Sequence, residues 1–237
     1  MSKSPTSPPP TISFRQTCLR ALVYLLGIGG IMQGVLWEAG LSPDIRFSEL
    51  GFTEITQSIL LLSCCLLLLY TRQVLGALPR VTLLMLGLLG SALIREQDAF
   101  LDIYVFDGAW QTLVTLLVLP ILYQTIRYRH AFMKEFESFS DSFAFGVFAS
   151  GFLCTFAFSR LFGRGVMWET LLGNNYDRIF KDAAEEVVEL FGYVLLLYAV
   201  IELCLWARRR FAASSEQTPA PQSQSDLVLQ QQQQKKQ

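Results

Sequence analysis

The sequence has 237 residues, of which 52% are hydrophobic and 16% are charged, and its mean hydropathy is +0.38. A soluble domain usually carries about 25% charged residues. Here the apolar residues are also concentrated in long uncharged segments, which excludes a cytosolic globular enzyme and a disordered regulator. Nineteen Lys and Arg residues against twenty Asp and Glu residues leave no basic surplus, which excludes a nucleic-acid-binding protein. The composition indicates an all-α, polytopic integral membrane protein.

Both ends of the chain differ in composition from its middle. Residues 1–14 are rich in Ser, Thr and Pro, and residues 211–237 contain the run Gln230–Gln234. Such segments bury too little apolar surface to fold, so we expect two disordered cytoplasmic tails. Residues 15–210 are expected to form one membrane domain.

Six apolar segments in this domain are candidates for transmembrane helices, each of which needs about 20 apolar residues. They cover approximately residues 18–37, 54–71, 80–95, 109–126, 142–162 and 184–206. The third is the weakest, because only fourteen uncharged residues separate Arg80 from Arg95. We nevertheless expect a bundle of six transmembrane helices, since leaving out the third would break the charge pattern in the second half of the chain.

The distribution of charge predicts the orientation of this bundle. With six crossings and the N-terminus inside, the inner segments carry thirteen basic and six acidic residues, whereas the outer segments carry six basic and fourteen acidic residues. Lys and Arg accumulate on the cytoplasmic side of membrane proteins, so both termini are expected in the cytoplasm. An uncleaved first helix and the lack of a disulfide framework favour a bacterial inner membrane.

Basic residues also concentrate in the inner connection at residues 127–141 and in Arg208–Arg210. Each Lys or Arg near an anionic membrane surface contributes about 1 kcal/mol of attraction. We therefore expect the lipid bilayer, and anionic lipid headgroups at these inner basic loops, to be the partners of the chain. A cytoplasmic protein bound at residues 127–141 is the alternative.

Acidic residues gather at the predicted outer ends of three helices, and spacings of three and four residues place them on common helix faces. A charge inside the membrane costs at least about 2.5 kcal/mol, so such groups usually face the bundle interior and find partners. We expect a polar cluster beneath the outer surface, in which Arg95 bridges carboxylates. Its predicted members are Glu54, Gln57, Arg95, Glu96, Asp98, Glu185, Glu186 and Glu189.

Three interpretations of this cluster remain open at the level of sequence. Carboxylates at a helix N-terminus gain about 0.3–1 kcal/mol each from the helix dipole, so the cluster can consist of caps and solvated charges. It can instead be a structural Arg–carboxylate network. It can also be a binding or catalytic centre, in which acidic oxygens suit Ca²⁺, Mg²⁺ or Mn²⁺ and Glu189 carries a proton.

Several known catalytic patterns are absent. The sequence lacks HExxH, and its one histidine, His130, lies in the inner connection rather than near the acidic cluster. Glu185–Glu186 is similar to the start of the EExxxR motif of CAAX-type intramembrane proteases, but Leu190 occupies the position of the required Arg, so the match fails. The sequence favours a structural or accessory membrane protein without a cofactor. The alternative is a membrane-embedded enzyme or a cation- or proton-coupled transporter.

Overall fold

The computed structural model describes residues 13–41 and 51–216, and all its regular elements within these ranges are helical. The prediction of an all-α chain is confirmed there. Most of the two predicted tails lies outside the described residues, although the last helix continues to Glu216. The elements are α1 (Phe14–Ala39), α2 (Phe52–Gln73), α3 (Pro79–Arg95), α4 (Asp98–Tyr104), α5 (Ala109–Arg127), α6 (Arg129–Ser140), α7 (Phe143–Leu153), the π-helix η1 (Cys154–Phe158), α8 (Ser159–Phe162), α9 (Gly165–Leu172), the 3₁₀-helix η2 (Gly173–Asn175) and α10 (Arg178–Glu216).

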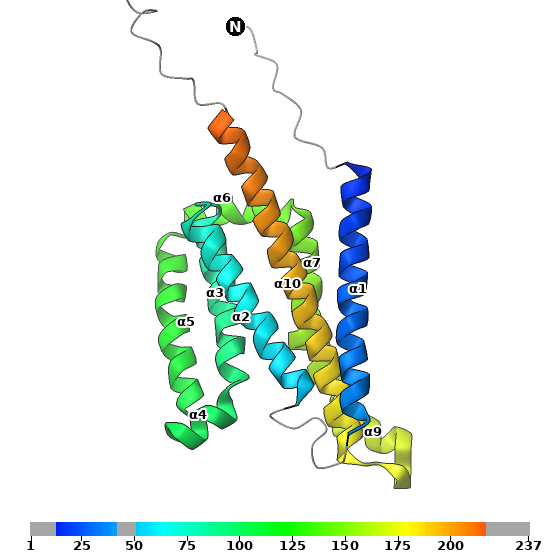
Figure 1. Cartoon of the computed structure of the whole chain (residues 1–237). Helices are drawn as coiled ribbons and strands as arrows, with labels where there is room; N and C mark the ends of the chain where they lie inside the picture. The colour runs from blue at the N-terminus through cyan, green and yellow to red at the C-terminus, as the bar shows by residue number, and fades with distance from the viewer. Residues whose placement is uncertain (1–12, 42–50, 217–237) are drawn as a thin grey trace, which may run out of the picture.

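The long helices run alternately up and down the bundle in chain order (Figure 1). α6 lies across the end at which α1 begins and α10 finishes, whereas α4 and α9 lie at the opposite end. We name these the basic end and the acidic end, because Lys and Arg outnumber Asp and Glu at the first and the reverse holds at the second. The basic end carries Arg15, Arg20, Arg72, Arg80, Arg127, Arg129, Lys134 and Arg208–Arg210.

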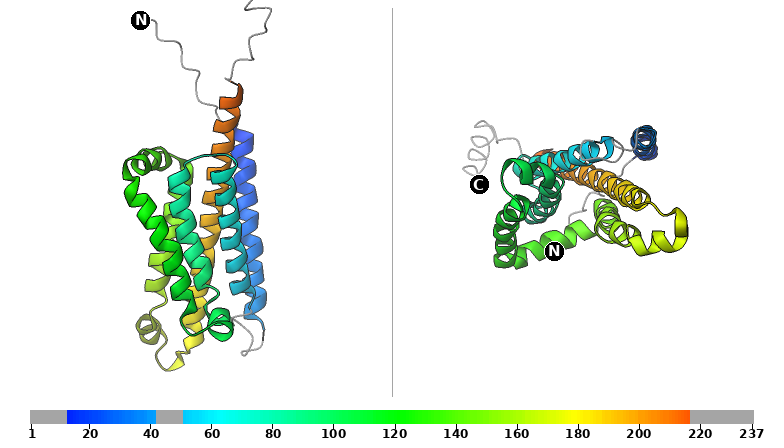
Figure 2. Two further views of the ribbon diagram at one scale, coloured as in Figure 1. Left: turned by 90° about the vertical axis from the view of Figure 1, so that its left-hand side faces the viewer. Right: turned by 90° about the horizontal axis from the view of Figure 1, so that it is seen from below.

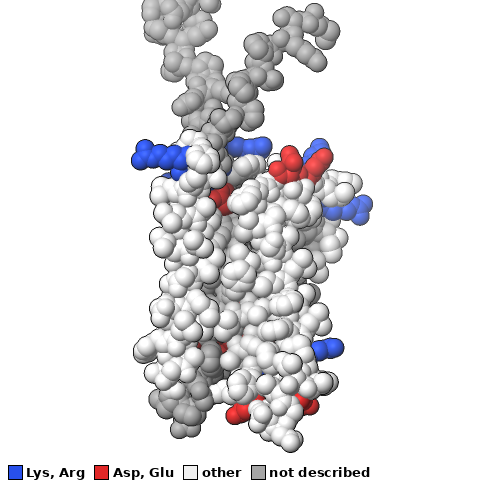
Figure 3. Space-filling model, turned by 90° about the vertical axis from the view of Figure 1, so that its right-hand side faces the viewer, with Lys and Arg blue, Asp and Glu red and all other residues white. Residues whose placement is uncertain are grey.

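Within the described residues, five helices are long and apolar enough to cross a bilayer: α1, α2, α5, the continuous helix at residues 143–162, and α10. They are consistent with a membrane-embedded protein. α1 is the clearest case of a helix that needs lipid around it, because only 6% of its most apolar 18-residue stretch is buried within the protein. Figure 3 shows charged side chains at the two ends of one face and a broad uncharged belt between them. Exposed apolar surface on this scale needs lipid around it rather than water.

The predicted third span coincides with α3 but is not among the five candidate spans. α3 has 17 residues, so at 1.5 Å per residue it is about 26 Å long. That falls just short of the hydrocarbon core of a typical bilayer, which is about 30 Å thick. α3 nevertheless packs between α2 and α5, and it runs from the basic end to the acidic end.

α10 is the central helix of the bundle, and 61% of its most apolar 18-residue stretch is buried. Seen along the bundle in Figure 2, α2 and α7 flank it and α1 stands at the edge. The core joins α2, α3 and α10 through side chains with no exposed surface, among them Leu61, Leu89 and Leu196.

Two carboxylates stabilise helix N-termini that belong to other parts of the chain. Glu38, at the end of α1, is fully buried and accepts hydrogen bonds from the amide (3.0 Å) and the hydroxyl of Thr53 in the first turn of α2. Glu135 of α6 accepts from the amides of Arg80 (2.7 Å) and Val81 (3.2 Å) in the first turn of α3. Both contacts satisfy amides that a helix cannot pair internally, and both place negative charge at the positive end of a helix dipole.

Candidate functional site: an acidic cavity between α2, α3, α8 and α10

Seven of the eight residues of the predicted polar cluster line one cavity of about 190 Å³ at the acidic end. We call it the acidic cavity. Asp98, the eighth residue, lies in an adjoining cavity of about 590 Å³, to whose lining Glu54, Arg95 and Glu96 also contribute. The acidic cavity is lined by Glu54, Gln57, Arg95, Glu96, Arg160, Asp182, Glu185, Glu186 and Glu189.

Packing of α2 against both α3 and α10 brings these residues together. The sequence supplies them from helix ends: α2 begins with Glu54 and Gln57, α3 closes with Arg95 and Glu96, and the first turns of α10 carry the remaining carboxylates. All nine lining residues carry a charge or an amide. The six carboxylates exceed the two guanidinium groups, so the lining has a formal surplus of negative charge.

Arg160, rather than the expected Arg95, bridges the carboxylates of α10. Its Nη1 atom pairs with Glu185 and its Nη2 atom lies 2.7 Å from Oε1 of Glu189. Glu189 has only 7% of its side chain exposed, whereas Arg160 has 42%. Within the described residues Arg95 makes no ion pair, so the bridging position that was expected for Arg95 is occupied by Arg160. The reason is that α8 approaches α10 more closely than the end of α3 does.

A π-helical turn explains how the helix at residues 143–162 presents these groups. Its first half is the α-helix α7, and the turn η1 spans Cys154–Phe158 before α8 begins at Ser159. A π turn holds one extra residue, which rotates the following side chains relative to a regular helix. As a result Thr155 and Ser159 are both buried, and the next residue, Arg160, reaches the carboxylates of α10.

Glycines let α10 and this helix come into backbone contact. A Cβ atom at Gly192 would overlap the hydroxyl oxygen of Thr155, and one at Gly151 would lie 3.0 Å from the backbone nitrogen of Leu196. A side chain at Gly163 would likewise collide with Glu185, so this glycine makes room for the ion pair of Arg160. The site therefore depends on the absence of side chains at three positions.

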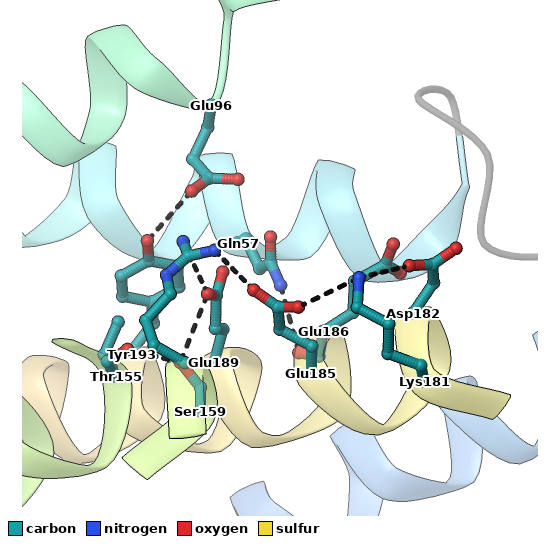
Figure 4. A network of polar contacts seen from close by, with 11 residues as sticks. Gln57, Glu96, Thr155, Ser159, Lys181, Asp182, Glu185, Glu186, Glu189 and Tyr193 are labelled. Carbon is teal, nitrogen blue, oxygen red and sulfur yellow. Dashed lines mark hydrogen bonds and ion pairs between the residues drawn. The ribbon is translucent and has the colours of Figure 1, made fainter. Parts of the chain in front are cut away.

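Hydrogen bonds extend the network beyond the ion pairs (Figure 4). Ser159 donates to Oε1 of Glu189 (3.2 Å), and the side-chain amide of Gln57 donates to the backbone carbonyl of Glu186 (3.2 Å). Deeper in the bundle, the buried hydroxyl of Tyr193 donates to Oε1 of Glu96 (2.9 Å). These bonds connect α2, the end of α3, α8 and α10 within one polar layer.

Glu96 follows the last residue of α3, and burial raises its pKa above the ordinary value of a glutamate. The hydrogen bond from Tyr193 and the positive charges of Arg95 and Arg160 act in the opposite direction and have smaller effects. Burial thus favours the protonated form of Glu96 relative to that of a glutamate in water.

Two side-chain atoms of this region are buried without a hydrogen-bond partner among the described residues. They are Oε2 of Glu186 and the hydroxyl oxygen of Thr155. Within the same ranges, no three Asp, Glu, His or Cys side chains converge closely enough to hold a metal ion. The geometry supports ion pairing, and a cation would need the carboxylates to rearrange around it.

Sequence reasoning missed Arg160, Ser159 and Thr155, and it gave no role to Glu38. The signal for Arg160 was available: it is a single cation near the end of an apolar helix, at the depth at which the carboxylates of α10 lack a partner. Nothing in the local pattern marks the π turn that orients Ser159 and Thr155. Comparisons with protein-family models, with curated proteins and with solved structures found no significant match to this chain.

Proposed function

We propose that this chain is a structural or accessory integral membrane protein with six crossing helices, both termini in the cytoplasm and the acidic cavity on the outer side. Three observations support the proposal. α3 runs the length of the bundle between two candidate spans, the basic residues gather where α1 begins and α10 finishes, and the exposed surface of α1 is apolar. A bacterial inner membrane is the proposed location.

In this proposal the acidic cavity fastens the outer ends of four helices to one another. The observation that carries it is the pairing of Arg160 with both Glu185 and Glu189, which joins α8 to two successive turns of α10. Charged groups at the edge of a membrane are stabilised by partners in the bundle. A network of this kind resists separation of the helices.

Thermal unfolding of the detergent-purified protein tests this role. Arg160→Gln should lower stability by about 1–3 kcal/mol, less than the loss of a fully buried pair, because Arg160 is partly exposed. The double variant Arg160→Gln/Glu189→Gln should recover part of the loss, since it also removes the buried charge of Glu189, while Glu185 keeps its ion pair with Lys181. Arg164→Gln, in an exposed residue four positions further on, is the control. Equal melting temperatures for Arg160→Gln and Arg164→Gln would refute the structural role.

A second candidate function is a cation- or proton-coupled transporter or a membrane-embedded enzyme that uses the same cavity. The surplus of carboxylates and the unpaired Oε2 atom of Glu186 favour it. Addition of Ca²⁺, Mg²⁺ or Mn²⁺ would then raise the melting temperature of the wild type by several degrees. The rise would disappear in Glu186→Gln and persist in Glu169→Gln, whose exposed carboxylate lies outside the cavity. No rise with any of the three ions would refute divalent-cation binding at the cavity.

A further inference from the structure

A second cavity, of about 250 Å³, lies near the basic end, between α1, the start of α7 and the last turns of α10. Of its lining residues, Ala21 and Phe143 are exposed, and Phe143 has 73% of its surface accessible. Trp206, Arg20 and Arg209 also line it. We call it the basic-end pocket. It combines apolar walls with two cations.

Only one of the two cations is neutralised by the surrounding protein. Arg20 pairs with Glu202 at 3.0 Å, and the hydroxyl of Tyr24 donates to the same carboxylate at 2.7 Å. Glu202 is 6% exposed, so its charge is fully committed to these two partners. The side chain of Arg209 makes no ion pair or hydrogen bond within the described ranges, which leaves the pocket with one positive charge to be matched.

We propose that the basic-end pocket binds a phospholipid, with the headgroup phosphate on Arg209 and the upper part of an acyl chain against Ala21 and Phe143. A guanidinium group binds phosphate oxygens through paired hydrogen bonds, and it is less strongly hydrated than an ammonium group. Arg209 also stands in the run Arg208–Arg210 that ends the apolar part of α10, which is the depth of lipid headgroups. The inference rests on the membrane placement proposed above.

The bound lipid completes the packing of α1. This helix contacts α2 and α10 but buries little of its own surface. A lipid in the basic-end pocket would fill the space between α1 and the start of α7 and would hold them at a fixed distance. A pocket that combines exposed apolar residues with an unmatched cation fits an amphiphile better than a soluble anion.

Thermal unfolding of the full-length protein in a non-ionic detergent tests the proposal with three probes. Dioctanoyl phosphatidylglycerol should raise the melting temperature by roughly 3–5 °C, whereas dioctanoylglycerol and glycerol 3-phosphate should have no effect. The rise should be lost in Arg209→Gln and kept in Arg208→Gln, because Arg208 lies over the ring of Tyr70, outside the pocket.

Because Arg209→Gln could fail to fold, a second variant tests the pocket while it keeps the charge of Arg209. Ala21→Phe should fill the pocket from an exposed position on α1 and should abolish the response to phosphatidylglycerol. An undiminished rise in both Arg209→Gln and Ala21→Phe would overturn the proposal. A rise with glycerol 3-phosphate alone would assign the pocket to a soluble phosphate ester instead. Reporter fusions at Ala77 and Phe106 test the six-helix topology separately, so failure of one proposal is distinguishable from failure of the other.

Discussion

The hydroxyl of Tyr193 donates a 2.9 Å hydrogen bond to the carboxylate of Glu96, which lies 97 residues earlier in the chain. Tyr193 is 1% exposed, so this bond forms in the interior of the bundle. It joins the second turn of the apolar part of α10 to the residue that follows α3. No other hydrogen bond or ion pair within the described ranges connects these two helices directly.

Tyr193→Phe should therefore destabilise the protein without changing the volume of the core. The variant removes a donor from a half-buried carboxylate, which costs about 1–2 kcal/mol. Thermal unfolding in detergent measures the loss. Tyr123→Phe is the matched control, because Tyr123 on α5 has 66% of its surface exposed. Equal melting temperatures for the two variants would show that the bond to Glu96 contributes nothing.

The raised pKa of Glu96 predicts a specific dependence of stability on pH. A carboxyl group with a raised pKa in the folded state contributes stability at low pH, and this contribution is lost as the pH rises through the raised value. Glu96→Gln keeps a neutral group that can accept the hydrogen bond of Tyr193. The melting temperature of the wild type should fall relative to Glu96→Gln as the pH rises above the ordinary pKa of a glutamate.

The control for this comparison is Glu137→Gln, which changes an exposed carboxylate of α6 at the basic end. The difference in melting temperature between the wild type and Glu137→Gln should change less with pH than the difference between the wild type and Glu96→Gln. A wild type that gains stability relative to Glu96→Gln as the pH rises would contradict the direction of the shift.

The contact between α7 and α10 predicts opposite effects for two Gly→Ala substitutions. Gly192→Ala would drive its methyl group into Thr155 and the backbone of the π turn, at a cost of about 1–3 kcal/mol or more. Gly29→Ala in α1 has no atom within 4 Å of the new methyl group, so helix propensity should stabilise it by up to about 1 kcal/mol. Similar melting temperatures for the two variants would mean that α7 and α10 do not touch at Gly192.

Reporter fusions test whether α3 crosses the membrane. Alkaline phosphatase is active only outside the cytoplasm, so a fusion after Ala77, between α2 and α3, should be inactive. A fusion after Phe106, between α4 and α5, should be active. Green fluorescent protein fused at the same positions should give the complementary pattern. Matching results at Ala77 and Phe106 would place both connections on one side and would remove α3 from the set of crossing helices.

The helices were predictable from the sequence to different degrees, because hydropathy reports apolar surface rather than helical structure. The segment expected at residues 184–206 belongs to α10, which begins at Arg178 and continues to Glu216. Its charged ends are helical, yet they carry no hydropathic signal. The segment at 80–95 agrees with α3, but its short length leaves the number of crossings a prediction.

The grouping of the acidic residues followed from a physical rule, whereas their partner did not. Carboxylates near a membrane interior must face other polar groups, so Glu54, Glu96 and Glu189 could be expected to converge from separate helices. The choice between Arg95 and Arg160 depended on which helix lies nearest to α10. That proximity is produced by Gly192 and by a π turn, and neither has a periodicity that reveals it. Ligand binding at the cavity stays a prediction.

The carboxylate of Glu135 links α6 at the basic end to α3, and through α3 to the acidic end of the bundle. Because Glu135 holds the amides of Arg80 and Val81, a force that displaces α6 would pull on the first turn of α3. α3 is a stiff rod of about 26 Å, so it would carry the displacement to Glu96 at its far end. An event at the basic surface thus has a direct mechanical path to the hydrogen bond of Tyr193.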